Sequence, residues 1–297
     1  MIDTPITINN KIALGTVQFG LDYGINNKNG QIPETKVFEI LQEAIISGIS
    51  ILDTAYVYGN SEQVIGNFIK KCGNQFKIIS KLPECNPEEV ITIFDSSLQR
   101  LNVNRLYGYM CHSFQHCMQN PEIWETLNEL RSEGRVEKIG LSLYYPSELE
   151  NIISSNLKFD IVQVPYNVFD RRFEPFFSIL KQRGVEIFVR STFLQGLVFK
   201  KPSELDGYFS KIQSKIATLH SLAAKMNVPI AALCLNFVVL NEFVDRVVVG
   251  VDSTQNLQEI ISSSVYCSNV KNVLHELDSL CEDDENMILP TNWKVQR

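Results

Sequence analysis

The sequence predicts an α/β protein built as one (β/α)8 barrel, or TIM barrel, with an N-terminal strand or hairpin and extra C-terminal helices. Eight short apolar runs alternate with helix-like segments along the 297 residues, and this alternation favours a closed parallel barrel. No Pro-, Gly- or Ser-rich linker divides the chain, so a single domain over residues 1–297 is expected. The Gly-x-Gly-x-x-Gly pattern of an open doubly wound sheet is missing after the first run. An open sheet is therefore the less favoured alternative.

The eight strands are predicted where short apolar runs lie between helical segments. They fall near Lys11–Leu14, Ile49–Leu52, Phe76–Ser80, Leu106–Cys111, Lys138–Leu141, Ile161–Val164, Glu186–Val189 and Arg246–Val249.

Helix boundaries follow from capping residues and apolar spacing. Pro33 and Glu34 open the first helix and Gly48 ends it, with apolar residues at helical spacing between them. A second amphipathic helix is expected from Ser61, read as its cap, to Lys70. Pro87 starts another helix, whose acidic first turn suits the positive helix end.

The last third of the chain departs from the simple repeat. Tyr208–Lys225 is a long amphipathic helix, and Pro229–Leu240 is apolar nearly all round, which predicts a buried helix inserted before the eighth strand. Val270–Cys281 is expected to form a terminal helix outside the repeat. The acidic run Glu282–Glu285 is read as solvated, although a tail in this position can border a barrel mouth.

Composition limits the partners. The net charge is −7 at pH 7 and no basic stripe is present, which argues against nucleic acid or an anionic membrane as the main partner. Seven cysteines without a Cys-x-x-Cys spacing are typical of reduced thiols, so a cytoplasmic protein is expected. The N-terminus lacks a signal-peptide pattern, and no apolar run approaches the roughly 18 residues of a membrane span. The sequence does not predict an oligomeric state.

Four ionisable residues occupy equivalent places along the chain. Asp53 and Tyr58 belong to the pattern Asp-x-Ala-x-x-Tyr-Gly-x-Ser-Glu, where a strand gives way to a helix. Lys81 and His112 each follow a later apolar run. In a parallel barrel the carboxyl ends of the strands carry the chemistry, so we expect these side chains to meet there. No His-x-His pair or cluster of acidic and His residues ends a strand, so no metal is expected.

In this order, Asp53, Tyr58, Lys81 and His112 resemble the catalytic tetrad of the aldo-keto reductases. The resemblance runs from Leu14-Gly15-Thr16 to the segment that begins at Gly250 and ends at Leu257. Other similar pieces are Gly134–Ser142, Gln163–Asn167 and Leu194–Leu197. Each piece is short, and their shared order carries the resemblance.

The resemblance implies reduction of an aldehyde or ketone, sugar-derived or simple, to an alcohol by a nicotinamide cofactor that supplies the hydride. Tyr58 would give the proton. Lys81 would lower the pKa of this phenol, because an ammonium stabilises the phenolate. Asp53 would pair with Lys81 and limit the cost of burying its charge. His112 would orient the carbonyl and donate a hydrogen bond to the oxyanion.

The resemblance also implies cofactor contacts. Ser142 and Gln163 suit the nicotinamide carboxamide, although Leu143 replaces an Asn that relatives usually carry. Arg190 stands where relatives often have a stacking aromatic; its guanidinium could stack, or pair with an acidic substrate or the pyrophosphate. The loop that starts at Ser191 would offer N–H groups to the pyrophosphate. The remaining expected contacts are Gly15, Thr16, Leu194, Gly196, Gly250, Ser253 and Asn256.

Cofactor choice is left open. The family default is NADP(H). Asp252 favours NAD(H) instead, because a carboxylate repels a 2′-phosphate and accepts a hydrogen bond from a 2′-hydroxyl. Alternatively, Asp252 only caps the following helix. Ile260 stands where relatives carry an Asn, which removes one expected adenine contact.

The substrate is a small carbonyl compound of unpredicted identity. The loop Gly20–Gly30 is longer than a barrel turn needs and is expected to border the pocket. An alternative function is a nicotinamide-binding regulatory subunit with little turnover, like the β subunits of potassium channels that share this fold. An unrelated metal-dependent barrel is less favoured. The expected pocket residues are Gln18, Phe19, Tyr23, Tyr56, Ser113 and Phe114.

Overall fold

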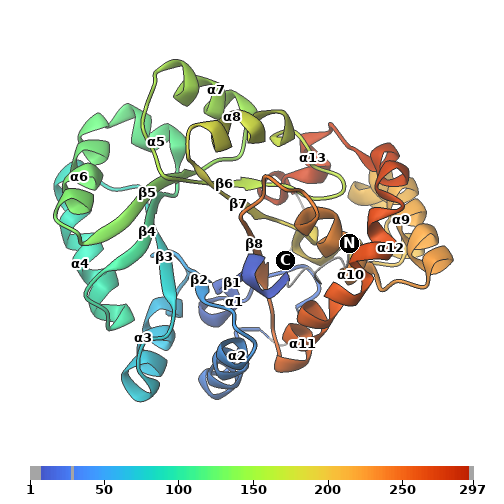
Figure 1. Ribbon diagram of the computed structural model, residues 1–297, viewed down its shortest axis with the longest axis horizontal. Helices are drawn as coiled ribbons and strands as arrows, with labels where there is room; N and C mark the ends of the chain where they lie inside the picture. The colour runs from blue at the N-terminus through green and yellow to red at the C-terminus, as the bar shows by residue number, and fades with distance from the viewer. Residues whose placement is uncertain (1–7, 28–29, 294–297) are drawn as a thin grey trace, which may run out of the picture.

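Eight parallel strands close into a barrel in chain order, from β1 to β8, in a computed structural model that describes residues 8–27 and 30–293 (Figure 1). The seam is closed by β8 against β1, with Gly250 beside Gly15 at its carboxyl end. The predicted (β/α)8 barrel is thereby confirmed. The strands are β1 Ile12–Gly15, β2 Ile51–Asp53, β3 Lys77–Leu82, β4 Leu106–Cys111, β5 Val136–Ser142, β6 Ile161–Pro165, β7 Glu186–Arg190 and β8 Arg246–Gly250.

Helices surround the barrel and bury their apolar faces against the outside of the strands (Figure 1). α10 lies directly before β8 and is buried except for its first two residues, as its apolar sequence predicts. The helices are α1 Val17–Gly20, α2 Glu34–Ile46, α3 Ser61–Cys72, α4 Val90–Leu101, α5 Phe114–Gln119, α6 Pro121–Ser132, α7 Pro146–Ser154, α8 Phe177–Gln182, α9 Gln213–Met226, α10 Ile230–Val239, α11 Thr254–Ser262, α12 Cys267–Lys271 and α13 Glu285–Ile288.

The barrel interior is filled by an apolar layer that supports the polar end. Ala13, Ile51, Ile79, Met110, Ile161 and Phe188 are among the residues of this separate cluster. Side chains on a strand alternate between its two faces, so the residue two positions later points the same way. Those later residues are Gly15, Asp53, Lys81, His112, Gln163 and Arg190. The polar side chains predicted from sequence therefore stand above a packed apolar floor.

Two local predictions are corrected. Ser61 is the first residue of α3 rather than its cap, and its hydroxyl donates instead to the Thr16 carbonyl at 2.9 Å. This bond ties α3 to the end of β1. The predicted terminal helix is broken, because Val273 leaves helical geometry between α12 and a 3₁₀ segment, Leu274–Leu280. An N-terminal strand or hairpin was expected without bounds. Ile8–Lys11, directly before β1, form a 3₁₀ helix instead, and residues 1–7 lie outside the described residues.

The acidic run after Cys281 is not merely solvated. Glu282 pairs with Lys215 at 3.0 Å, and Glu285 pairs with Arg172 at 2.7 Å. The Glu282 N–H also donates to the Phe169 carbonyl at 2.8 Å. These contacts attach the C-terminal segment to the β6–α8 loop and to α9, beside which it lies in Figure 1. We refer to them below as the C-terminal clasp.

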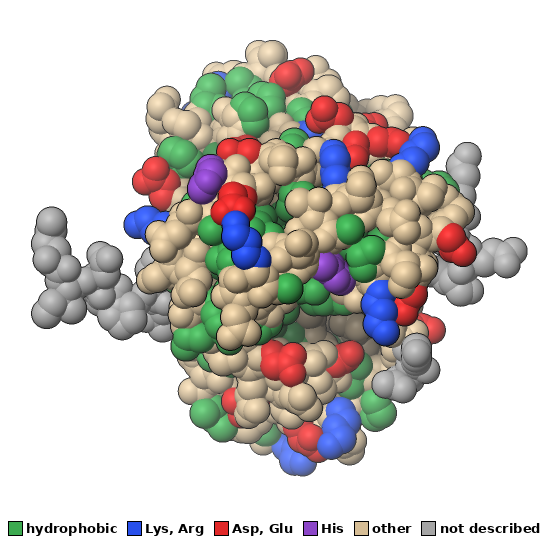
Figure 2. Space-filling model, turned by 90° about the vertical axis from the view of Figure 1, so that its right-hand side faces the viewer, with side chains coloured by type: hydrophobic (Ala, Val, Ile, Leu, Met, Phe, Trp, Pro, Cys, Tyr) green, Lys and Arg blue, Asp and Glu red, His purple; other side chains and the backbone are tan. Residues whose placement is uncertain are grey.

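The surface carries mixed charges. On the face shown in Figure 2, acidic and basic side chains are interspersed without a large patch of one sign. In the part of the chain that the structure describes, no single helix is long and apolar enough to cross a membrane. One bent pair, Gly207–Met226 with Ile230–Val239, reaches that length and hydropathy only across a 96° break. All seven cysteines are free thiols.

Candidate active site

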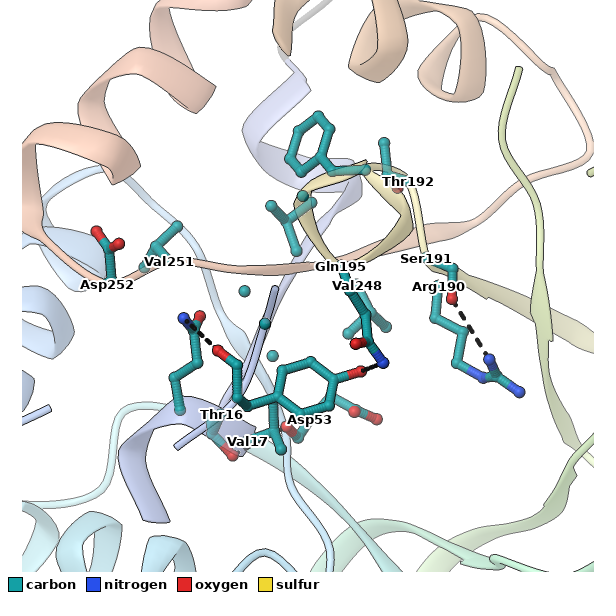
Figure 3. Close-up of a pocket in the computed structure, with 18 of the residues that line it drawn as sticks. Thr16, Val17, Asp53, Arg190, Ser191, Thr192, Gln195, Val248, Val251 and Asp252 are labelled. Carbon is teal, nitrogen blue, oxygen red and sulfur yellow. Dashed lines mark hydrogen bonds between the residues drawn. The ribbon is translucent and has the colours of Figure 1, made fainter. Parts of the chain in front are cut away.

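A cavity of about 390 Å³ opens at the carboxyl ends of the strands. Its size falls in the range of small-molecule sites. It extends from Tyr58 and His112 past the ends of β5–β7 to Asp252 after β8. Figure 3 shows Arg190 and Asp252 at opposite ends of this cavity. The end near Tyr58, His112 and Arg190 is called the catalytic end below.

Asp53 and Lys81 form a buried ion pair at the bottom of the cavity. The Lys81 ammonium donates to Asp53 Oδ2 at 2.7 Å and to the Thr54 carbonyl at 2.9 Å. The Gln163 amide donates to Asp53 Oδ1 at 2.8 Å, so both carboxylate oxygens are bonded. The Lys81 side chain is 0% exposed. A buried charge needs this degree of pairing.

Tyr58 lies above this pair and beside His112. The Lys81 nitrogen is 5.2 Å from the centre of the Tyr58 ring, and the Tyr58 and His112 rings meet edge to face at 5.9 Å. The structure therefore brings all four tetrad residues to one place. Gly20 makes room for the Tyr58 loop, because a Cβ at Gly20 would lie 1.8 Å from the Tyr58 carbonyl oxygen.

The pKa values in the cavity favour neutral side chains beside the ion pair. Burial raises the pKa of Tyr58, and the Asp53 carboxylate raises it further, while the Arg190 charge opposes both. The expected lowering of this pKa by Lys81 is not found, and Arg190 is the charge that lowers it. Burial, followed by the charges of Lys81 and Arg190, lowers the pKa of His112 to about 3. At neutral pH Tyr58 keeps its proton and His112 is an uncharged imidazole.

The ends of β5 and β6 place the two residues expected for the carboxamide side by side. Ser142 and Gln163 are register partners, both are buried, and both line the cavity. Leu143, the replacement for the usual Asn, is fully buried and lies outside the cavity lining. One N–H of the Gln163 amide is bonded to Asp53, which leaves its other N–H and its oxygen for a ligand.

Arg190 is held at the end of β7 by its neighbours. Its guanidinium donates to the Leu143 carbonyl at 3.0 Å and to the Ser191 hydroxyl at 3.4 Å, and it stacks 4.1 Å from the centre of the Tyr144 ring. Tyr144 also lines the cavity and was not predicted. The only signal for Tyr144 in the sequence was an aromatic residue two positions after Ser142.

At the far end of the cavity, the structure contradicts the interpretation that Asp252 caps the following helix. The cap of α11 is Ser253, whose hydroxyl accepts the Asn256 N–H at 3.2 Å. Asp252 instead accepts a bond from the Asn256 side-chain amide at 2.5 Å, and it is exposed at the cavity wall. Gly250 and Asn256 line the cavity beside it, whereas Ser253 does not.

Two loops meet over the cavity. The Ile25 N–H donates to the Gln195 carbonyl at 3.1 Å, the Gln195 amide donates to the Tyr23 hydroxyl at 2.9 Å (Figure 3), and the Asn26 amide donates to the Gly196 carbonyl at 2.7 Å. The loop after α1 thus borders the mouth as expected. Leu194 is buried outside the lining, and its N–H bonds to Ser191.

Several other residues that were expected to contact the cofactor or the substrate line the cavity. Gly15, Thr16 and Ser191 line the cavity, as do Gln18 and Tyr23, but the Thr16 hydroxyl is engaged with the Asp53 carbonyl at 3.0 Å. Lining residues from the segments that were expected to border the cavity are Gly24, Asn26, Asn27, Thr192, Phe193, Gln195 and Val251. Lining residues that the sequence did not predict are Val17, Tyr144, Phe199, Val248 and Val249.

Four expected pocket residues lie away from the cavity. Phe19, a residue of α1, is fully buried in the core, and Tyr56 stacks 4.0 Å from the Arg100 guanidinium. Ser113 caps α5 by accepting the His116 N–H, and Phe114 packs against the core. Each has a structural partner that holds it outside the lining, so these placements correct the prediction. Among the described residues, no cluster of three or more His, Cys, Asp or Glu could hold a metal ion.

The chain matches known proteins over most of its length. A sequence profile of the Aldo/keto reductase family matches residues 11–281. NADH-specific methylglyoxal reductase of Escherichia coli is 28% identical over 222 residues, or 66% of this chain and 67% of that protein. L-galactose dehydrogenase of Arabidopsis thaliana is 21% identical, covering 95% of both chains. The holo form of a Bacillus halodurans aldo-keto reductase has a similar fold, with a TM-score of 0.76, 20% identity and coverage of 93% and 95%.

The fold and the site together define a barrel oxidoreductase. The family match extends over most of the chain, so this protein belongs to the aldo/keto reductase family. As a member it is an NAD(P)H-dependent enzyme.

Proposed function

We propose that this enzyme reduces a small aldehyde or ketone, simple or sugar-derived, to the alcohol, with Tyr58 as the proton donor. The observation that carries the proposal is the buried Lys81–Asp53 pair directly beneath Tyr58, beside His112. A packed interior with no catalytic task would have little use for an ammonium that is 0% exposed.

The cavity residues fit a nicotinamide cofactor. Ser142 and the free oxygen of Gln163 offer a donor and an acceptor for a carboxamide. The N-terminus of α11, next to Gly250, suits a phosphate. When bound, the cofactor supplies the hydride that no side chain can provide.

Proton transfer is assigned to this chain's own residues. Tyr58 holds its proton at neutral pH because burial raises its pKa, and it releases that proton to the oxygen of the reduced carbonyl. The Lys81 ammonium and the Arg190 guanidinium then stabilise the phenolate that is left. His112 is neutral, so it donates a hydrogen bond to the oxyanion without competing as an acid.

The test is Tyr58→Phe, which removes one oxygen and little volume. Loss of a general acid typically lowers the rate by about 10²–10⁴. Reduction of an aldehyde is followed by loss of nicotinamide absorbance, and cofactor binding should persist. Tyr56→Phe is the matched control, since Tyr56 stacks on Arg100 outside the cavity. A near-normal kcat in Tyr58→Phe would reject the assignment.

We propose that Asp252 favours NADH over the family default, NADPH. Asp252 lines the far end of the cavity and does not cap α11; its Oδ1 accepts from Asn256, which leaves Oδ2 for a ribose hydroxyl. The E. coli relative is named as NADH-specific, and this supports the proposal. Repulsion between a single exposed carboxylate and a 2′-phosphate should weaken NADPH binding by on the order of 1 kcal/mol. Some NADPH use should therefore persist.

The alternative is a regulatory subunit of the same fold with little turnover. The complete tetrad argues against it, because a protein that only binds a nicotinamide does not need a proton donor. Turnover of a generic aldehyde decides between the two. One domain over residues 1–297, a cytoplasmic location and a small-molecule partner without nucleic acid remain predictions.

A further inference from the structure

Arg190 carries the one charge at the catalytic end that the described residues do not balance. The charged side chains lining the cavity are Asp53, Arg190 and Asp252. Asp53 is neutralised by Lys81 at 2.7 Å. No ion pair among the described residues includes Arg190. A partly buried guanidinium in such a position favours an anionic ligand.

The guanidinium is fixed in place before any ligand arrives. Tyr144 covers one of its faces at 4.1 Å, and the Leu143 carbonyl accepts from one amino group at 3.0 Å. A guanidinium has five N–H groups, of which these contacts and Ser191 use two. The remaining edge can therefore make the paired hydrogen bonds that a planar carboxylate accepts.

The position of Arg190 separates it from the adenosine end of the cofactor. Figure 3 shows Arg190 at the end of the cavity opposite Asp252, where the adenosine ribose is proposed to lie. The loop that starts at Ser191 is expected to offer N–H groups to the pyrophosphate, so contact of Arg190 with the pyrophosphate is the alternative that the NADH titration below tests. Arg190 is close enough to Tyr58 and His112 for its charge to act on both. An anion held by Arg190 would lie next to the proton donor.

We propose that Arg190 binds a carboxylate of the substrate, so that the preferred substrates are short carbonyl compounds bearing a carboxylate a few bonds from the reacting carbon. This inference rests on the proposed reductase function and names its substrate class. The Arg190–carboxylate contact fixes the far end of the substrate, which leaves the carbonyl oxygen to Tyr58 and His112.

Matched substrate pairs test the proposal. Succinic semialdehyde is compared with its uncharged amide, and para-carboxybenzaldehyde with para-tolualdehyde. The wild-type enzyme should favour the carboxylate of each pair by about tenfold or more in kcat/KM, as expected for a charge-assisted hydrogen bond. Arg190→Met should remove most of this preference and bring the ratio of kcat/KM values close to one, mainly through KM. Arg190→Lys, which keeps the charge but not the planar fork, should retain part of it.

Direct binding gives a readout that does not depend on turnover. Calorimetric titration with benzoate should show binding to the wild-type NADH complex, weaker binding to Arg190→Lys and none to Arg190→Met, whereas benzamide should not distinguish the three. Titration with NADH alone separates a cofactor role. If Arg190→Met weakens NADH binding and leaves the carboxylate preference intact, the residue serves the cofactor and the inference is wrong.

The outcomes separate this inference from the proposed function. Equal turnover of both members of each pair by the wild-type enzyme rejects the carboxylate site and leaves the reductase standing. Turnover of neither member rejects the reductase, and benzoate binding then decides the site alone. Loss of benzoate binding in Arg190→Met supports it, and unchanged binding overturns it.

Discussion

Lys81 is a buried, hydrogen-bonded member of the tetrad, so its replacement should affect both activity and stability. It is 0% exposed and donates to Asp53 and to a main-chain carbonyl. Lys81→Met should abolish reduction at neutral pH, because Tyr58 would lose the charge that stabilises its phenolate. It should also destabilise the fold by about 3–5 kcal/mol, since Asp53 is left as an unpaired buried charge. Aldehyde turnover and urea denaturation measure the two effects.

The control for Lys81→Met is its combination with Asp53→Asn. The double variant has no unpaired charge, so it should recover much of the lost stability without recovering activity. Asp53→Asn alone should weaken reduction rather than abolish it. Full activity in Lys81→Met would contradict the assigned role whatever its stability.

His112 gives the fold a dependence on pH. Its pKa in the folded protein is about 3, below the ordinary value near 6.5. Between these values the unfolded chain binds a proton that the folded chain does not, so stability rises with pH across this window and levels off above it. His112→Gln should remove part of this slope, at most about 1.4 kcal/mol per pH unit. Denaturation midpoints near pH 4.5 and pH 7.5 measure it, with His116→Gln as the matched control.

Asp252 determines the cofactor ratio only if it faces the ribose. Asp252→Arg should raise NADPH affinity strongly and lower NADH affinity slightly, because the 2′-phosphate gains a cation and the 2′-hydroxyl loses an acceptor. Fluorescence titration of both cofactors against the wild type and the variant checks this. An unchanged ratio would show that the carboxylate, which the Asn256 amide holds at 2.5 Å, points away from the 2′ position.

At the scale of elements, the close contact between α1 and the Tyr58 loop links packing to catalysis. A Cβ at Gly20 would lie 1.8 Å from the Tyr58 carbonyl oxygen and 2.5 Å from the Ser61 nitrogen. Gly20→Ala must therefore push the loop aside, and a shift of about 1 Å can cost 10² in kcat. The control is Gly134→Ala, which has a φ of 73° and no neighbour within 4 Å. It should lose about 1 kcal/mol of stability through strain and keep its activity.

The elements also show what the sequence could predict. The strands could be predicted because each is a short buried run. The meeting of Asp53, Tyr58, Lys81 and His112 at one end of the barrel could be predicted because they lie at or just after the ends of those runs. The orientations of Phe19 and Tyr56 could not be predicted from the sequence. A single-turn helix and a loop have no periodicity that fixes which way a side chain points. The contact of Tyr23 with Gln195 joins residues 172 positions apart, and only the closed barrel brings them together.

For the whole molecule, the C-terminal clasp joins the tail to the catalytic end. Arg172 bonds Asp170 at 2.9 Å, Glu285 at 2.7 Å and the carbonyl of Tyr144, which stacks on Arg190. The acidic tail thus supports the residue that we propose to bind the substrate carboxylate. The sequence alone could not show this, because a run of acidic residues is most often solvated.

Two variants of the C-terminal clasp, Arg172→Met and Glu285→Gln, should lower the free energy of unfolding by different amounts. Arg172→Met leaves the fully buried Asp170 unpaired and should cost about 3–5 kcal/mol in the free energy of unfolding. Glu285→Gln breaks only the pair with Arg172, in which Glu285 is 44% exposed, and should cost less than about 1 kcal/mol. Urea denaturation measures both, with the exposed Asp283→Asn as control.

Because Arg172 also holds the Tyr144 carbonyl, Arg172→Met should raise KM for an aldehyde more than Glu285→Gln does. Equal KM values in the two variants would show that the clasp stabilises the barrel without positioning Tyr144 and Arg190.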